Sequence, residues 1–293
     1  MGGRNLGILY SGTMAAWFTI FFLAPLLIIV ACSFMKRDLR GNGILGTFSL
    51  EAYQALGNPN FGIITIRTIG VSLASTLLII LIALPCGYYI ARSKRQTLLL
   101  LLIIIPFWTN FLIRVFAWMN ILGSAGFVNE LLLRLGAVKE AVVFMYNQRA
   151  VVLVLVYMYL PYAILPLFST IDKFDFSLLE AARDLGASNL TAMVKVLLPN
   201  IRSGIYTAVL FTFIPILGAY AIPVLVGGKD SYMLGNVVAD QLTRARNWPL
   251  ASAISMILTL VTTLGILLMM GLQRRDAARI AGSSRKRGPQ DEA

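Results

Sequence analysis

The sequence predicts an all-α integral membrane protein with six transmembrane helices, on the strength of two observations. First, 58% of the 293 residues are hydrophobic and only 13% are charged, which is about half the charged share of a soluble globular protein. Second, the apolar residues form continuous runs of about 20, long enough to cross a hydrocarbon core of about 30 Å. A β-barrel would instead alternate over segments of about ten residues. The six runs are Met14–Phe34, Thr68–Ala91, Leu98–Met119, Ala150–Ile171, Gly204–Val226 and Leu250–Leu272.

The first run has two interpretations. Arg4 and an apolar stretch that ends at Cys32 are also typical of a lipoprotein signal with its cleavage cysteine. The apolar region of a signal has about 7–15 residues, and Met14–Phe34 is longer. The other runs make the rest of the chain a membrane protein too. We therefore expect an uncleaved first span.

Residue usage excludes several kinds of site. The sequence has no histidine, which removes histidine-based catalysis, metal ligation and proton relay. Cys32 and Cys86 both lie inside apolar runs, so we expect neither a disulfide framework nor a metal site. The net charge of +12 is typical of nucleic-acid binding or of orientation signals in membrane-protein loops. The second interpretation is favoured, and we expect no nucleic-acid partner and no catalytic residue.

Charge in the loops predicts the orientation. The connection between the second and third runs, residues 92–97, is short and carries Arg92, Lys94 and Arg95, which places it in the cytoplasm. An even number of spans then places both termini in the cytoplasm. We expect a first transmembrane helix with its outer loop (1–60), a five-helix core with a loop at 172–203 (61–272), and a disordered basic tail (273–293).

The outer loops contain local signals of their own. Gly41-Asn42-Gly43 predicts a turn, and the amphipathic stretch Val128–Leu135 predicts a short interfacial helix. Two arginines, Arg67 and Arg114, lie near the outer ends of their runs. Both can extend their charged heads to the interface. Arg114 interrupts an aromatic stretch, so it can alternatively line a substrate route.

The inside loop at residues 172–203 differs from the others. Ser177 and Glu180 have the spacing of a capping box, which predicts the start of a short helix. Gly186 then predicts its end, and Ser188 can cap a second helix that leads to Pro199. The apolar side of the first helix is formed by Leu178, Leu179, Ala182 and Leu185. Such a helix either rests on the bilayer or contacts another protein.

The spacing of the whole loop favours the second alternative. Glu180-Ala181-Ala182 is followed by three residues, Gly186, nine residues and Val196-Leu197-Leu198-Pro199. This pattern resembles the signature loop of ABC importer permeases, E-A-A-x3-G-x9-I-x-L-P, with Val196 in place of isoleucine. The resemblance implies the type I ABC importer permease fold, with this loop forming a coupling helix. ATPase-coupling roles are implied for Glu180, Ala181, Ala182, Gly186, Leu198 and Pro199.

The resemblance also implies partners. The sequence has no G-x-x-x-x-G-K-[ST] phosphate loop, so ATP and Mg²⁺ would be bound by a separate ATPase subunit, and this chain needs no cofactor of its own. The family assembles two permease chains with two ATPases and a periplasmic substrate-binding protein. Its members lie in the bacterial inner membrane as multi-pass proteins.

Further stretches resemble the spermidine/putrescine branch of these permeases. They are 106–114, 178–188, 217–228 and Arg246-Asn247-Trp248-Pro249. A polyamine would use aromatic faces along its route, although Trp and Tyr also collect at membrane interfaces in general. Candidate substrate-path residues are Trp108, Arg114, Tyr157, Tyr162 and Tyr220.

Three rival functions remain at this point. A related ABC permease for an opine, ferric ion or an oxyanion would share the same loop. An ion-coupled secondary transporter would need acidic or histidine residues within the spans and, in general, internal repeats, and neither is seen. A membrane enzyme would need a paired nucleophile and base. The sequence does not distinguish putrescine from spermidine.

Overall fold

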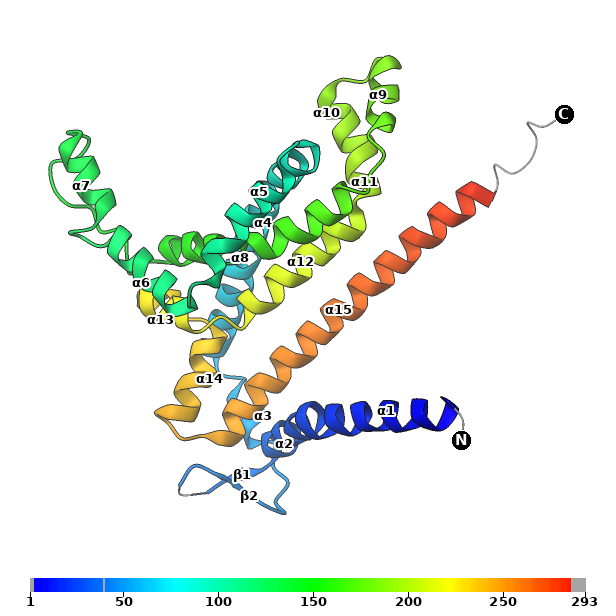
Figure 1. Ribbon diagram of the computed structural model, residues 1–293. Helices are drawn as coiled ribbons and strands as arrows, with labels where there is room; N and C mark the ends of the chain where they lie inside the picture. Colours follow the sequence, from blue (N-terminus) through cyan, green and yellow to red (C-terminus); the bar gives the residue numbers. More distant parts are fainter. Residues whose placement is uncertain (1–2, 39, 286–293) are drawn as a thin grey trace. The chain divides into compact units, whose positions relative to one another are not determined.

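The computed structural model describes residues 3–38 and 40–285 of the chain, and the side chains within 11–38 and 40–274 (Figure 1). The described part is mainly helical. By length and composition, five helices are able to cross a membrane, and a sixth is obtained when one bent pair counts as a single span. Helices are expected here because every backbone N–H and C=O must be paired within a segment when lipid replaces water.

The first compact unit comprises residues 1–66 and 234–261. Its first span is α1 (Gly3–Phe18), a π-helical turn (Thr19–Leu23) and α2 (Ala24–Ser33), which confirms the first predicted run. The strands β1 (Lys36–Arg37) and β2 (Gly43–Ile44) form an antiparallel hairpin around the predicted turn. The unit also contains α3 (Glu51–Ala55), the start of α4 (Pro59–Arg92), α14 (Leu234–Thr243) and the start of α15 (Trp248–Arg285).

Hydrogen bonds join distant segments of this unit. The backbone N–H of Trp248 donates to the carbonyl oxygen of Gly41 at 3.1 Å, and Arg37 donates to the carbonyl oxygen of Ala245 at 2.7 Å. Gly41 has a φ of +92°, and a Cβ there would overlap the backbone of Arg246. The hairpin therefore packs directly on the turn between α14 and α15, about 200 residues later in the chain.

The second compact unit comprises residues 67–233 and 262–293. It contains most of α4 (Pro59–Arg92), then α5 (Gln96–Ile104), a 3₁₀ turn (Ile105–Trp108), α6 (Phe111–Leu122), α7 (Phe127–Arg134) and α8 (Gln148–Ile171). There follow α9 (Ser177–Asp184), α10 (Asn189–Ala192), a π-helical turn (Met193–Leu197), α11 (Leu198–Asn200), α12 (Arg202–Leu217), α13 (Ala221–Val226) and a 3₁₀ turn (Lys229–Ser231).

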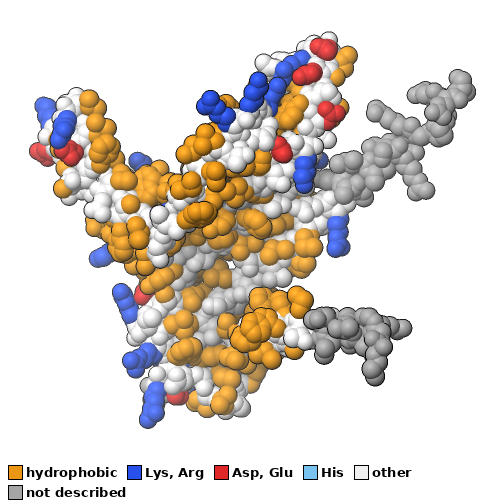
Figure 2. All heavy atoms as spheres, in the orientation of Figure 1, with side chains coloured by type: hydrophobic (Ala, Val, Ile, Leu, Met, Phe, Trp, Pro, Cys, Tyr) orange, Lys and Arg blue, Asp and Glu red, His pale blue; other side chains and the backbone are white. Residues whose placement is uncertain are grey.

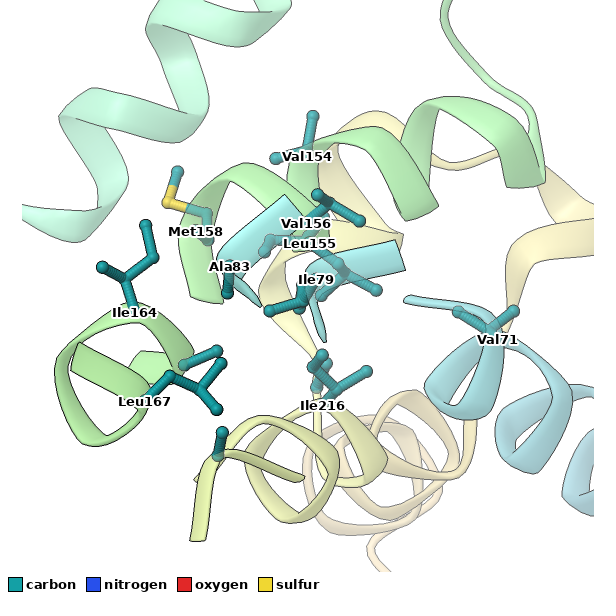
Figure 3. Packing of buried hydrophobic residues seen from close by; sticks show 14 of the residues in the cluster. Val71, Ile79, Ala83, Val154, Leu155, Val156, Met158, Ile164, Leu167 and Ile216 are labelled. Carbon is teal, nitrogen blue, oxygen red and sulfur yellow. The ribbon is translucent and has the colours of Figure 1, made fainter. Parts of the chain in front are cut away.

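The core of the second unit lies where α4, α8 and α12 meet (Figure 3). Ile79 and Ala83 are one turn apart on α4 and face Leu155 of α8, and Ile216 of α12 joins the same cluster. Small residues bring the helices close together. A Cβ on Gly204 of α12 would lie 2.8 Å from the Cβ of Thr170 on α8, so only glycine fits at this crossing. This use of small residues is typical of helix contacts in membranes.

Two predicted runs are not single helices, and these predictions were wrong. The run Leu98–Met119 is divided by extended backbone at Thr109 and Asn110, so α5 and α6 are separate helices. The run Gly204–Val226 is divided at residues 218–220 between α12 and α13. In the first run, Pro106 and the Asn110 side chain, which caps α6, favour the break. Continuous hydropathy could not reveal either break.

Two further predictions concern the ends of segments. The helix predicted at Val128–Leu135 is confirmed as α7, and its place at the membrane interface stays a prediction. The disordered tail predicted from residue 273 differs from the structure, because α15 continues to Arg285, and residues 286–293 lie outside the described part. The sequence 274–281 contains three alanines and three arginines, which are good helix formers.

Candidate functional site

The 172–203 loop of the second unit carries α9, α10 and α11, which project together at one end of that unit in Figure 1. The predicted capping box is wrong in its details. Ser177 is the first residue of α9 instead of its cap, and its backbone N–H donates to Asp175 Oδ1 at 3.0 Å. The Ser177 hydroxyl and then its backbone N–H lower the pKa of the Asp175 carboxyl below its ordinary value of 3.8. Asp175 thus accepts the backbone N–H of Ser177, which a capping box would pair with the Glu180 side chain.

The end of α9 is formed as predicted. Gly186 has a φ of +86°, in the left-handed region where glycine is favoured. Its N–H donates to the carbonyl of Arg183 at 2.8 Å, and the N–H of Ala187 donates to the carbonyl of Ala182 at 3.0 Å. These two bonds define a Schellman motif. Ser188 Oγ then accepts the N–H of Thr191 at 3.2 Å, so the predicted cap of the second helix is confirmed.

The predicted apolar side of α9 is divided between core and solvent. Leu179 is 1% exposed and joins the hydrophobic cluster, with Ala182 half-buried beside it. Leu185 is 89% exposed at the tip of the loop. Glu180 and Ala181 are also exposed. The tip therefore presents an apolar residue, a carboxylate and a small residue outward, and Figure 2 shows charged side chains of both signs gathered at this end.

Aromatic and polar contacts fix the base of the loop. The Arg92 guanidinium, at the end of α4, lies over the ring of Phe176 at 5.3 Å and donates to Tyr88 Oη at 3.3 Å. Gln96 of α5 donates to Asp172 Oδ1 at 3.0 Å. The segment that leads into α9 is thereby attached to the end of α4 and the start of α5. The sequence indicates Arg92 only as a topology signal, and the stretch 172–176 contains no pattern that predicts this packing.

The exit of the loop is bent. The helical pair Asn189–Asn200 and Arg202–Leu217 meets at an angle of 74°. Leu198 and Pro199 lie in α11 at this bend and are half-buried, while Leu197 and Ile201 beside them are buried. Proline removes an N–H that a straight helix would use. Because the helix bends here, α10 leaves the start of α12 at a steep angle, and α9 is placed with it.

Two of the five candidate substrate-path residues meet in one aromatic cluster. Arg114 and Tyr157 are brought together through Phe107: the guanidinium lies 4.3 Å from the Phe107 ring, which lies 6.2 Å from the ring of Tyr157. Trp118 completes this cluster at 5.3 Å from Tyr157. Phe107 is not among the predicted site residues, although it stands next to Trp108 in the stretch 106–114.

The other three candidate residues are Trp108, Tyr162 and Tyr220. Trp108 is 79% exposed at the end of the 3₁₀ turn. Tyr162 pairs with Tyr159 at 5.8 Å, and Tyr220 lies at the break between α12 and α13. For Arg114, Nε and Nη1 are buried without a hydrogen-bond partner among the described residues. Its guanidinium is thus held against a ring of its own chain.

Apolar helices long enough to cross a membrane, together with the exposed 172–203 loop that carries α9, α10 and α11, are the architecture expected of a membrane transport subunit. Residues 79–282 match the family described as binding-protein-dependent transport system inner membrane component. The chain belongs to this family. Its members are non-catalytic permease subunits of ABC transporters located in the inner membrane, and a separate subunit hydrolyses ATP.

Individual relatives agree with this assignment. The chain is 35% identical over 260 residues to the spermidine/putrescine transport system permease protein PotB of Escherichia coli, covering 88% of this chain and 94% of that protein. It is 29% identical over 291 residues to the inner membrane ABC transporter permease protein YdcU of the same species, covering 94% and 92%. The fold is similar to that of a bacterial alginate ABC transporter solved with its alginate-bound periplasmic protein. In that comparison the TM-score is 0.75, the identity 16%, and the coverage 93% of this chain and 96% of the other.

Proposed function

We propose that this chain translocates polyamines, spermidine or putrescine, as one permease subunit of an ATP-driven importer. The observation that carries the substrate class is the 35% identity to a spermidine/putrescine permease over nearly the full length of both chains. The second permease, two ATPases and a periplasmic binding protein complete the importer. ATP and Mg²⁺ are bound by the ATPases.

The 172–203 loop is the ATPase docking element of this proposal. Glu180 supplies a charged contact, and the small Ala181 and Ala182 permit close approach of another surface. Gly186 ends the helix so that Leu185 is presented at the tip. Closure of the ATPases moves α9. The contact between Arg92 and Phe176 transmits this movement to α4, and the bend at Pro199 transmits it to α12.

The orientation follows from the same proposal. The 172–203 loop must face the ATPases in the cytoplasm, and residues 92–97 lie at the same end of the second unit, because Gln96 donates to Asp172. Both termini are then cytoplasmic. The region 1–60 supplies the first span with its outer loop, and 61–272 the permease core.

Charge reversal tests the docking element. Glu180→Lys is expected to abolish uptake in proteoliposomes and to uncouple ATP hydrolysis from the binding protein, because the exposed carboxylate is replaced by the opposite charge. The complex should still assemble, since Glu180 does not belong to the buried core. The matched control is Glu140→Lys, an exposed charge reversal in the loop before α8. Normal uptake by the Glu180→Lys protein would contradict the proposed role.

Calorimetry tests the cargo. The binding protein that serves this importer is titrated with spermidine, putrescine, an opine, ferric ion and an oxyanion. We expect heat of binding only with the two polyamines. Binding restricted to one of the other solutes would refute the polyamine assignment and leave membership of the permease family intact.

A further inference from the structure

A pocket beside α6 has a composition suited to an ammonium group. Its volume is about 650 Å³, and it lies between the second half of α6 and residues 143–146, which precede α8. Phe116 contributes an aromatic ring from α6, while Phe144 and Tyr146 contribute rings from the opposite segment. Three aromatic side chains thus border one space in the second unit.

The backbone of this pocket is held in an unusual conformation. Tyr146 has a φ of +61°, which is rare for a bulky residue. Its N–H donates to the carbonyl of Val226 at 2.8 Å, and a Cβ on Gly228 would overlap the Tyr146 carbonyl oxygen. Asn147 Nδ2 also donates to the carbonyl of Phe144 at 2.8 Å. Strain that the surrounding structure maintains in this way gathers at functional sites.

The chemistry of the lining favours a cation. Aromatic faces attract ammonium groups, and the sulfur of Met119 is polarizable. Asn120 donates its amide nitrogen to the carbonyl of Phe116 at 2.9 Å, so its Oδ1 is the group that it presents as an acceptor. The lining residues that the structure describes carry no charge. A site without a carboxylate would bind an amine weakly. Weak binding is required along a transport route, because the cargo must leave the site again.

We infer that this pocket is a transient binding site for the ammonium end of an alkylamine cargo. The inference rests on the proposed function and adds a place where the cargo is held. With the proposed orientation, α6 ends on the outer side of the membrane, where a binding protein releases its ligand. The site uses Phe116, Phe144 and Tyr146, none of which the sequence analysis had selected.

Cysteine modification tests this inference on the complete importer. Val143, which is 72% exposed and lines the pocket, is replaced by cysteine after Cys32 and Cys86 have been changed to serine. The reagents are 2-aminoethyl methanethiosulfonate, a cation, and methyl methanethiosulfonate, which is neutral. The reference variant is Leu135→Cys, at a position that is 71% exposed and outside the lining.

We expect the ratio of cationic to neutral reaction rates to be about threefold to tenfold higher at position 143 than at position 135, because aromatic faces concentrate the cation. Phe116→Leu should lower this ratio, and spermidine should protect position 143 while 1,4-butanediol should not. Equal ratios at the two positions would overturn the inference. If the Val143→Cys complex does not assemble, Ser124→Cys in the same lining replaces it.

A separate measurement distinguishes the two proposals. Uptake of radiolabelled spermidine by the unmodified importer tests the cargo assignment alone. If uptake is absent but the ratio of cationic to neutral reaction rates is higher at position 143 than at position 135, the polyamine function is refuted and the cation site is retained. Normal uptake with equal ratios would refute the pocket and retain the function.

Discussion

Gly186 ends α9 with a φ of +86° and allows the chain to reverse toward Ser188. Only glycine adopts this conformation without a steric penalty, which is about 1–2 kcal/mol for an L-residue. At the other end of α9, the Asp175 carboxylate accepts the backbone N–H of Ser177. Its lowered pKa means that the carboxylate favours the folded loop, so its contribution is present above pH 3.8 and is lost as the pH falls through the lowered pKa.

Gly186→Ala is predicted to weaken the end of α9. The strain of about 1–2 kcal/mol should raise the hydrogen-exchange rate of the Ala187 amide, which donates to Ala182, about tenfold. Hydrogen exchange followed by mass spectrometry measures this. Gly70→Ala is the matched control, since Gly70 lies in α4 and a Cβ there meets nothing within 4 Å. Unchanged exchange in the Gly186→Ala protein would contradict the argument.

At the scale of elements, close packing of α8 against α12 determines the core of the second unit. Gly204 faces Thr170 where the two helices cross, and Gly87 of α4 faces the backbone of Phe168. Gly204 permits an approach that a side chain would prevent, and a Cβ at Gly87 would make a tight contact of 3.3 Å with the Phe168 nitrogen. The bend of 74° before α12 then sets the direction in which the 172–203 loop projects.

Gly204→Ala is predicted to destabilise this crossing by about 1–3 kcal/mol, the usual cost of overpacking. The midpoint of thermal denaturation of the purified complex should fall. Thr170→Ala in the same chain should restore part of the loss, because it removes the Oγ1 atom that the new methyl group would overlap. Additive effects of the two substitutions would show that the two residues do not interact as described.

At the scale of the whole molecule, the charged loops determine how the chain lies in the membrane. The proposed orientation places residues 92–97, the 172–203 loop and both termini on the cytoplasmic side. The basic tail after Leu272 agrees with the rule that Lys and Arg remain inside. In this orientation the ATPases bind on the cytoplasmic side, and the binding protein delivers the cargo on the opposite side of the bilayer.

Alkaline phosphatase fusions test this orientation. A fusion after Ala293 is predicted to be inactive, because the enzyme requires export from the cytoplasm, whereas a fusion after Leu135 should be active. Green fluorescent protein fused at the same two positions should give the reverse pattern. An active phosphatase at the C-terminus would refute the proposed topology.

The sequence by itself determined the membrane class, most of the spans and the position of the 172–203 loop. These follow from local properties, namely hydropathy, charge and the glycine at position 186, because lipid makes each span close its own hydrogen bonds. The ends of α9 illustrate the limit. Gly186 was predicted correctly, whereas the helix start is anchored by Asp175 instead of a Ser177–Glu180 box, since several polar residues there compete to accept the same N–H groups.

Only the tertiary structure decided which side chains meet. It divided two apolar runs, at Thr109–Asn110 and at residues 218–220, which uniform hydropathy could not show. It placed Arg114 on Phe107 and left Trp108 largely exposed. It also gathered Phe116 and Tyr146, 30 residues apart, around one pocket. The physical reason is that apolar pattern fixes which segments enter the membrane, whereas contacts between segments depend on helix crossings set by close packing across the fold.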